Sequence, residues 1–311
     1  MIIYGFIKSQ KEVCIYMKKI IFKGCGTAIA TPFDENGVNY SEFEKLIEFQ
    51  ISNGADSIIV CGTTGESATM TDSERKEVIK FVVDIVKERI PVIAGTGSNC
   101  TLTAVEMAKF ATNVGVDGIL VVTPYYNKAT QKGLIEHFKA IASSVPYTPI
   151  ILYNVPGRTS VNISPETCLE LSKIDNIVAI KEASGNISQV AKIASLCGDN
   201  LNIYSGNDDQ ILPILSLGGI GVISVLSNIA PQRVSKMIKD FEKGDLSSAK
   251  KIQLESLEII EALFSEVNPI PVKAALNILG YNYGIPRLPL TPISNENFEK
   301  LSNAMSKIFQ N

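Results

Sequence analysis

Short apolar segments recur along the chain, and polar stretches with helical spacing separate them. Eight of these segments are rich in residues that favour strands; they cover residues 27–30, 57–60, 91–94, 118–122, 150–153, 177–180, 202–204 and 221–224. Because each segment is apolar at consecutive positions, both of its faces are expected to be covered. That pattern is typical of a parallel sheet flanked by helices.

Helix start signals lie between these strands. Three pairs of residues carry them: Ser41 with Glu44 and Thr71 with Glu74 as capping boxes, and Ser164 with Pro165 as an N-cap and first-turn proline. Eight strand–helix units with right-handed crossovers close into an α/β fold, the (β/α)8 TIM barrel. A doubly wound sheet competes, but no G-x-G-x-x-G turn follows the first strand. We therefore predict a barrel over residues 20–244.

After the eighth unit the pattern becomes helical only. Helices are predicted over residues 247–264, 271–279 and 296–309, so residues 245–311 are expected to form a C-terminal helical domain. At the other end, Met17 is an alternative start codon. We interpret residues 1–19 as a leader whose translation the sequence leaves open.

Composition excludes several classes of protein. Of 311 residues, 45% are hydrophobic and 20% are charged, which indicates a globular chain and not a disordered one. The formal net charge is −3, from 29 Lys+Arg and 32 Asp+Glu, without the dense positive charge that nucleic-acid binding requires. No apolar run is long enough to cross a membrane. We expect a cytoplasmic protein with neither nucleic acid nor membrane as a partner.

Cysteine and histidine usage argues against metal chemistry. The six cysteines are scattered without a C-x-x-C pair, and His137 is the single histidine. Zinc and iron–sulfur sites therefore lack a ligand set, and neither a metal nor another cofactor is expected. We interpret His137 as a surface helix residue and the cysteines as small buried hydrophobic residues of a reducing compartment.

Lys181 follows the apolar strand 177–180. Active sites of this barrel lie at the carboxyl ends of its strands. Burial would lower the pKa of a lysine there, as an amine that forms a Schiff base requires. The alternative is a structural ion pair with Glu182 or another carboxylate.

Other strand ends carry further candidates. Thr63 and Thr64 lie in a small-residue turn that suits a carboxylate or phosphate, although such turns also simply connect strands to helices. Tyr153 can relay a proton and Arg158 can clamp a carboxylate, or they are an interfacial tyrosine and a solvent-facing arginine. The aromatic residues of segment 123–127 suit either the site or an oligomer contact. Together these groups indicate aldol chemistry on a keto acid without a metal.

The segments that carry these residues resemble one family. They are Gly62-Thr-Thr-Gly-Glu66, Thr123-Pro-Tyr-Tyr-Asn127, Tyr153-Asn-Val-Pro-Gly-Arg158, Val178-Ala-Ile-Lys-Glu-Ala-Ser184, Ser205-Gly-Asn-Asp208 and Gly221-Val-Ile-Ser224. From about Ile20 to the C-terminus the chain is similar to the dihydrodipicolinate synthases, within the superfamily of pyruvate-dependent aldolases that includes N-acetylneuraminate lyase. The resemblance implies a lyase that condenses pyruvate with L-aspartate-4-semialdehyde. Its product, 4-hydroxy-tetrahydrodipicolinate, enters diaminopimelate and lysine biosynthesis.

The resemblance also implies a role for each matching residue. Lys181 matches the Schiff-base lysine, and Thr63, Tyr126 and Tyr153 match a proton relay. Thr64 matches the site of the pyruvate carboxylate, and Arg158 matches the site of the semialdehyde carboxylate. Gly206 and the Ile223 carbonyl match the pocket near the lysine. In the family the residue at Tyr126 reaches across a dimer interface. A homotetramer of two tight dimers, or a dimer alone, is implied.

Three positions depart from lysine-inhibited members of the family. Asp72 and Arg75 replace histidines and Thr103 replaces a glutamate, whereas Ser67, Ala68, Asn99 and Tyr125 still fit the inhibitor pocket. The ammonium of the inhibitor would lose its carboxylate partner, so weak or absent lysine feedback is expected.

Two alternatives accompany this prediction. N-acetylneuraminate lyases and 2-keto-3-deoxy sugar-acid aldolases share the lysine and tyrosine but cleave longer polyols, which the combination of Tyr126 and Arg158 disfavours. A non-catalytic paralogue that binds a keto acid is the alternative from another class. The presence of all four of these residues argues against it: Lys181, Thr63, Tyr126 and Tyr153.

Overall fold

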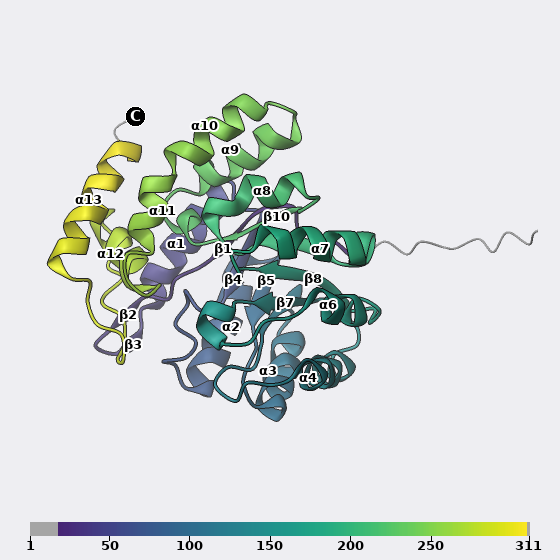
Figure 1. The fold of residues 1–311 in the computed structure, drawn as a ribbon. Coiled ribbons are helices and arrows are strands. Elements are labelled where there is room, and N and C mark those ends of the chain that lie inside the picture. The colour runs from purple at the N-terminus through teal and green to yellow at the C-terminus, as the bar shows by residue number, and fades with distance from the viewer. Residues whose placement is uncertain (1–17, 310–311) are drawn as a thin grey trace, which may run out of the picture.

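Eight parallel strands form a closed barrel at the centre of the molecule (Figure 1). The computed structural model describes residues 18–309, so most of the predicted leader lies outside the described residues. The barrel strands are β1 (Gly24–Ala28), β4 (Ser57–Val60), β5 (Val92–Gly95), β6 (Gly118–Val122), β7 (Ile150–Asn154), β8 (Ile177–Glu182), β9 (Asn202–Ser205) and β10 (Gly221–Ser224). They follow one another in chain order, and β10 closes the barrel against β1. The predicted (β/α)8 barrel is confirmed.

Strand ends match the prediction to within a few residues. Segments 57–60, 118–122 and 221–224 coincide with β4, β6 and β10. The largest displacement is at β1, which starts at Gly24 and not at residue 27, because Gly24 and Cys25 already pair with β10. A short antiparallel hairpin, β2 (Phe33–Asp34) with β3 (Gly37–Val38), follows β1.

Helices cover the outside of the barrel. They are α1 (Tyr40–Ser52), α2 (Asp72–Val86), α3 (Thr101–Asn113), α4 (Gln131–Ser144), α5 (Pro156–Thr159), α6 (Pro165–Leu171), α7 (Ile187–Cys197), α8 (Ile211–Ser216) and α9 (Pro231–Glu242). The predicted caps Thr71 and Ser164 are confirmed by hydrogen bonds from the backbone N–H groups of Glu74 and Thr167. The capping box at Ser41 is wrong: α1 begins one residue earlier, and the Asn39 side chain caps it. The Asn39 N–H is held by the carbonyl of Pro32, which places that side chain at the helix start.

The C-terminal helices lie together on one side of the barrel (Figure 1). They are α10 (Leu246–Glu255), α11 (Leu257–Leu263), α12 (Ile270–Ile278) and α13 (Asn295–Phe309). The predicted single helix 247–264 is therefore wrong, since it divides at Ser256. The Ser256 hydroxyl accepts a partly buried hydrogen bond from Arg233 Nε at 2.7 Å and donates to the Ile252 carbonyl at 2.6 Å.

Two side-chain environments differ from the prediction. His137 is 5% exposed and not at the surface, because it lies on the face of α4 that packs toward α3, where its Nδ1 is 2.9 Å from the Thr101 hydroxyl. Cys100 is exposed, at the N-cap of α3, where the chain turns outward. The other described cysteines are buried, as predicted: Cys25, Cys61, Cys168 and Cys197.

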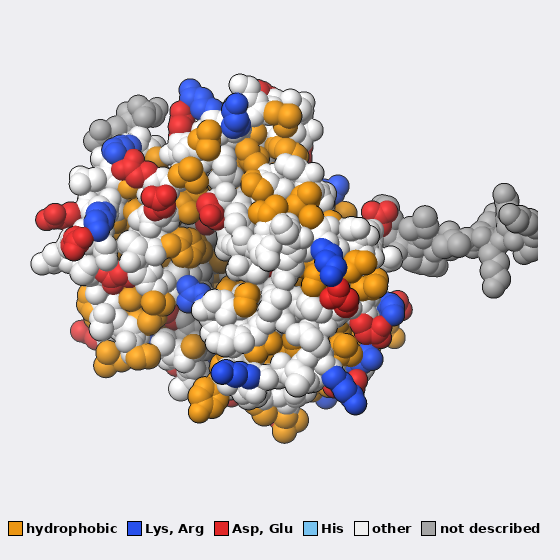
Figure 2. All heavy atoms as spheres, viewed as in Figure 1, with side chains coloured by type: hydrophobic (Ala, Val, Ile, Leu, Met, Phe, Trp, Pro, Cys, Tyr) orange, Lys and Arg blue, Asp and Glu red, His pale blue; other side chains and the backbone are white. Residues whose placement is uncertain are grey.

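Two hydrophobic clusters stabilise the fold. The larger lies between the strands and the surrounding helices. The smaller fills the barrel interior, where the Phe22 and Tyr204 rings stack at 4.4 Å and Ile59, Ile93 and Ile151 lie among its members. On the face that Figure 2 shows, acidic and basic side chains are interspersed. Within residues 18–309, no helix has the length and apolar character needed to span a membrane.

Candidate active site

Lys181 and Tyr153 face each other inside the barrel. They are register partners on the neighbouring strands β8 and β7, so their side chains leave the sheet on the same side. Lys181 is 5% exposed, and its Nζ lies 4.4 Å from the centroid of the Tyr153 ring. The barrel interior beneath them is apolar. A primary amine and a phenol thus meet at the carboxyl end of the barrel, where this fold carries its chemistry.

Glu182 does not pair with Lys181, which removes the simplest structural role for that lysine. Its side chain leaves the strand on the opposite face, where its carboxylate accepts bonds from Asn154 Nδ2 at 2.9 Å, Ser184 N–H at 2.7 Å and Gln189 Nε2 at 3.2 Å. Across the part of the chain that the structure describes, Lys181 forms no ion pair.

Asp208 is the carboxylate that interacts electrostatically with Lys181. It is buried and accepts bonds from the Ser224 hydroxyl at 2.5 Å and from the backbone N–H groups of Val225 and Leu226. Burial raises the pKa of Asp208; the hydrogen bonds to its carboxylate, and to a smaller extent the charge of Lys181, oppose that shift. This carboxylate therefore joins the ends of β9 and β10 beside the amine.

Thr63 and Tyr153 line the same small pocket. Cys61, Ser67, Gly95, Gly97 and neighbouring apolar residues complete its wall. The strand ends approach closely here: a Cβ on Gly95 would lie 2.1 Å from the Cys61 carbonyl oxygen. Glycine at position 95 thus permits the turn after β4 to lie against the next strand.

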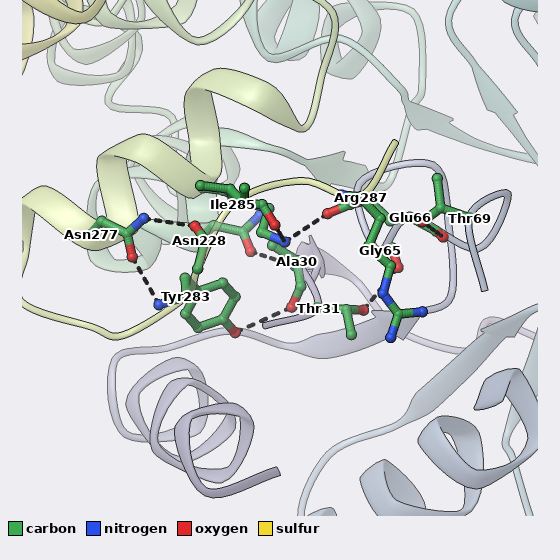
Figure 3. Close-up of polar contacts among 12 residues, drawn as sticks. Ala30, Thr31, Gly65, Glu66, Thr69, Asn228, Asn277, Tyr283, Ile285 and Arg287 are labelled. Carbon is green, nitrogen blue, oxygen red and sulfur yellow. Dashed lines mark hydrogen bonds and ion pairs between the residues drawn. The ribbon is translucent and has the colours of Figure 1, made fainter. Parts of the chain in front are cut away.

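Buried polar contacts fix the turn that carries Thr63 and Thr64. The Thr31 hydroxyl donates to the Gly65 carbonyl at 2.8 Å, and Glu66 adopts a left-handed backbone conformation with a φ of 54°. Lys273 of α12 donates to the Glu66 carboxylate at 2.8 Å. Figure 3 shows Glu66 between the Gly65 turn and the segment that contains Ile285 and Arg287.

Sequence reasoning missed the C-terminal contribution to this turn. Lys273 pairs with Glu66 across 207 positions of sequence, and Asn268 Nδ2 donates to the Thr64 hydroxyl at 3.0 Å across 204 positions. A lysine within the apolar segment 270–276 was the available signal, because an unpaired charge is rarely buried.

Gly206 directly follows β9, and Ile223 lies on β10. The Gly206 N–H donates to the Glu182 carbonyl at 2.8 Å, and a Cβ at position 206 would lie 2.6 Å from the Ala183 Cβ. Ile223 is fully buried in the same interior cluster as Tyr153. Both positions therefore belong to the wall around Lys181.

Tyr126 and Arg158 lie away from this centre within one chain. Tyr126 is 90% exposed with a φ of 73°, and Arg158 is exposed on the short helix α5. Within residues 18–309, no polar or ring contact joins either side chain to Lys181 or Tyr153. Both side chains are free to meet a ligand or a second copy of the chain.

Metal-binding clusters are absent from the part of the chain that is described. No group of three or more His, Cys, Asp or Glu side chains there is arranged to hold a metal ion. Besides the Asp208 carboxylate, the polar groups near Lys181 are hydroxyls and a phenol, which bind carboxylates and move protons.

Comparison with known proteins agrees with this geometry. Residues 21–308 match the model of the Dihydrodipicolinate synthetase family. The 4-hydroxy-tetrahydrodipicolinate synthase of Acetivibrio thermocellus is 57% identical over 289 residues, covering 93% of this chain and 98% of that protein.

Solved structures superpose closely on the barrel and the C-terminal helices. Dihydrodipicolinate synthase of Cyanidioschyzon merolae with lysine bound is 44% identical, with a TM-score of 0.90 over 93% of this chain and 99% of that one. The chloride-inhibited enzyme of Acinetobacter baumannii complexed with pyruvate is 42% identical, with a TM-score of 0.89 over 92% and 98% of the two chains. This chain belongs to the dihydrodipicolinate synthetase family.

Proposed function

We propose that this protein is a 4-hydroxy-tetrahydrodipicolinate synthase. It condenses pyruvate with L-aspartate-4-semialdehyde at the entry to diaminopimelate and lysine biosynthesis. The observation that carries the proposal is the Lys181 amine, buried against Tyr153 at the carboxyl end of β8 and without an ion-pair partner among residues 18–309. A relative with a TM-score of 0.89 binds pyruvate, which supports the same first substrate here.

The chemistry begins with attack of the neutral Lys181 amine on the ketone carbon of pyruvate. Loss of one water leaves an imine, which withdraws electrons from the adjacent methyl carbon. That carbon releases a proton, and the resulting enamine attacks the aldehyde of the second substrate to form a carbon–carbon bond. The amine of the semialdehyde then displaces Lys181 from the imine carbon, which closes the ring and frees the enzyme. This sequence requires no metal.

Protons move through three hydroxyl groups in this proposal. Tyr153 and Thr63 line one pocket beside Lys181, which supports their pairing in a relay. Tyr126 is the third member. Its 90% exposure supports a position in the neighbouring subunit's site. We accordingly propose a homo-oligomer with a tight dimer as its unit, most simply a homotetramer.

Substrate carboxylates are assigned to separate groups. Thr64 binds the pyruvate carboxylate, and Arg158 receives the semialdehyde carboxylate. Gly206 and the Ile223 carbonyl line the pocket near Lys181, as the place of Gly206 directly after β9 and of Ile223 on β10 supports. In this proposal residues 20–244 are the catalytic domain, and residues 245–311 are a helical domain that supports it.

Reductive trapping tests the first step. Borohydride with pyruvate is expected to add a stable three-carbon adduct at Lys181, located by peptide mass spectrometry. Lys181→Ala should abolish the adduct, whereas the exposed control Lys80→Ala should retain it. A wild-type enzyme without the adduct would refute the aldolase chemistry and favour a non-catalytic keto-acid-binding protein.

The acceptor is tested separately. Turnover with aspartate-4-semialdehyde is compared with turnover of pyruvate with N-acetylmannosamine. A preference for the semialdehyde supports the proposal. A preference for the amino sugar would assign the chain to the N-acetylneuraminate lyases instead.

A further inference from the structure

Asn268 lies just before α12 and contacts the site turn. Its side chain is 4% exposed, and its Nδ2 donates to the hydroxyl of Thr64 at 3.0 Å. Thr64 is itself 2% exposed. A hydroxyl that accepts a bond from an amide retains its own proton for another acceptor.

Neither group has its full set of partners. Within residues 18–309, the Thr64 hydroxyl has no acceptor for its proton. The Oδ1 atom of Asn268 is also buried without a hydrogen-bond partner. A buried polar atom left unpaired destabilises the folded state. The unused O–H of Thr64 at this buried point indicates a place for a ligand that accepts a hydrogen bond, as a carboxylate oxygen does.

The position of Asn268 relative to Thr64 is fixed by a second attachment. Lys273, five residues further along, pairs with Glu66, and the backbone N–H of Arg287 donates to the other Glu66 oxygen at 2.9 Å. Figure 3 shows Arg287 and Ile285 beside Glu66. The C-terminal segment therefore holds the turn from both ends of the Thr64–Glu66 stretch.

We propose that Asn268 is a positioning residue that directs the Thr64 hydroxyl proton toward the carboxylate of the bound keto acid. The C-terminal segment is then part of the keto-acid site. This inference rests on the proposed function, in which Thr64 binds the pyruvate carboxylate.

The test uses the full chain and two keto compounds. Borohydride trapping at Lys181 is titrated with pyruvate and with methyl pyruvate, whose ester has no charged carboxylate. Asn268→Ala should raise the half-saturating pyruvate concentration about tenfold, which corresponds to one hydrogen bond of about 1.4 kcal/mol. The half-saturating concentration of methyl pyruvate should change less than about twofold in the same variant.

Matched variants separate positioning from folding. Asn268→Leu removes the amide but keeps the branched shape and the number of side-chain heavy atoms, so it tests the idea even where Asn268→Ala does not fold. Asn277→Ala is the control, because Asn277 lies in α12 and makes two comparable bonds, to Gly284 and Tyr283, without touching the site turn. It should trap pyruvate as the wild type does.

Three outcomes are decisive. Selective loss of pyruvate affinity in both Asn268 variants supports the inference. Equal weakening for the two keto compounds, or unchanged pyruvate affinity in folded Asn268 variants, overturns it. A wild-type protein that traps no pyruvate at all refutes the proposed function itself, which distinguishes that failure from the failure of Asn268.

Discussion

The ammonium of Lys273 lies 2.8 Å from the carboxylate of Glu66, and both side chains are fully buried. The ammonium also lies 4.3 Å from the centroid of the Phe33 ring. Burial lowers the pKa of Lys273, and the attraction of Glu66 opposes that shift. One ion pair thus joins α12 to the turn that carries Thr63 and Thr64.

Breaking this pair should destabilise the protein strongly. Lys273→Met leaves the Glu66 carboxylate buried without its cation, and we expect a loss of about 3–5 kcal/mol in the free energy of unfolding. Urea denaturation of the full chain measures it. Replacing both partners, Glu66→Gln with Lys273→Met, should recover part of the loss because no charge then remains buried.

An exposed ion pair provides the control for Lys273. Lys300 and Glu296 pair at 2.7 Å on α13, where water screens them. Lys300→Met should change the unfolding free energy by less than about 1 kcal/mol. Equal effects of Lys273→Met and Lys300→Met would show that the buried pair contributes no more to the free energy of unfolding than the exposed pair does.

Tyr153→Phe should impair proton transfer more than imine formation. The ring packing against Lys181 is retained, but the phenolic hydroxyl is lost. A fall in kcat of about 10²–10⁴ is expected, with pyruvate trapping still detectable. Tyr147→Phe, at a side chain that is 96% exposed, is the matched control and should leave kcat unchanged. An unchanged kcat in Tyr153→Phe would remove this residue from the relay.

Arg158→Ala should affect the second substrate selectively. Arg158 is exposed on α5, so its removal should leave folding intact. Loss of a charge-assisted bond should raise the KM for aspartate-4-semialdehyde by about tenfold to a hundredfold. The half-saturating pyruvate concentration in the trapping assay should not change. A larger effect on pyruvate than on the semialdehyde would contradict the assignment.

Lysine should inhibit the enzyme weakly or not at all. The Arg75 guanidinium is buried, donates to the Gly95 carbonyl at 3.2 Å and lies 3.6 Å from Asp72. Because Asp72 and Arg75 match positions of the inhibitor pocket in lysine-inhibited members of the family, we expect the Arg75 cation to disfavour the inhibitor there, and Thr103 supplies no carboxylate. Steady-state assays should show little loss of rate at sub-millimolar lysine, and Thr103→Glu should increase sensitivity. Strong inhibition of the wild type would refute this prediction.

His137 should make stability fall at mildly acidic pH. Burial lowers its pKa from an ordinary 6.5 to about 4. Between these pH values the unfolded chain binds a proton at His137 that the folded chain does not bind. The contribution of neutral His137 to the free energy of unfolding is therefore complete above pH 6.5 and declines as the pH falls toward 4.

Urea denaturation at neutral and mildly acidic pH measures the His137 effect. His137→Gln keeps a polar partner for the Thr101 hydroxyl but does not titrate. The variant should lose less stability on acidification than the wild type. Identical losses would show that another group controls the pH dependence.

Strand periodicity and strand ends were sufficient to predict the barrel and its central pair. Apolar segments of three to five residues recur because a parallel strand is covered on both faces, and a lysine at the end of such a segment differs clearly from its neighbours. Lys181 and Tyr153 lie at corresponding ends of adjacent strands, so their proximity follows from the fold class. Local signals such as the Thr71 cap could also be predicted from the sequence, because the Glu74 N–H donor and the Thr71 acceptor lie only three residues apart.

Contacts between distant segments were beyond local patterns. Asn268 and Lys273 meet Thr64 and Glu66 across more than two hundred positions, and nothing in the helical spacing of α12 indicates which turn it contacts. His137 was misjudged for the same reason, since a polar residue on an amphipathic helix becomes buried only when a neighbouring helix supplies its partner. Local periodicity specifies secondary structure and its buried face, whereas the pairing of polar groups depends on the packing of the complete chain.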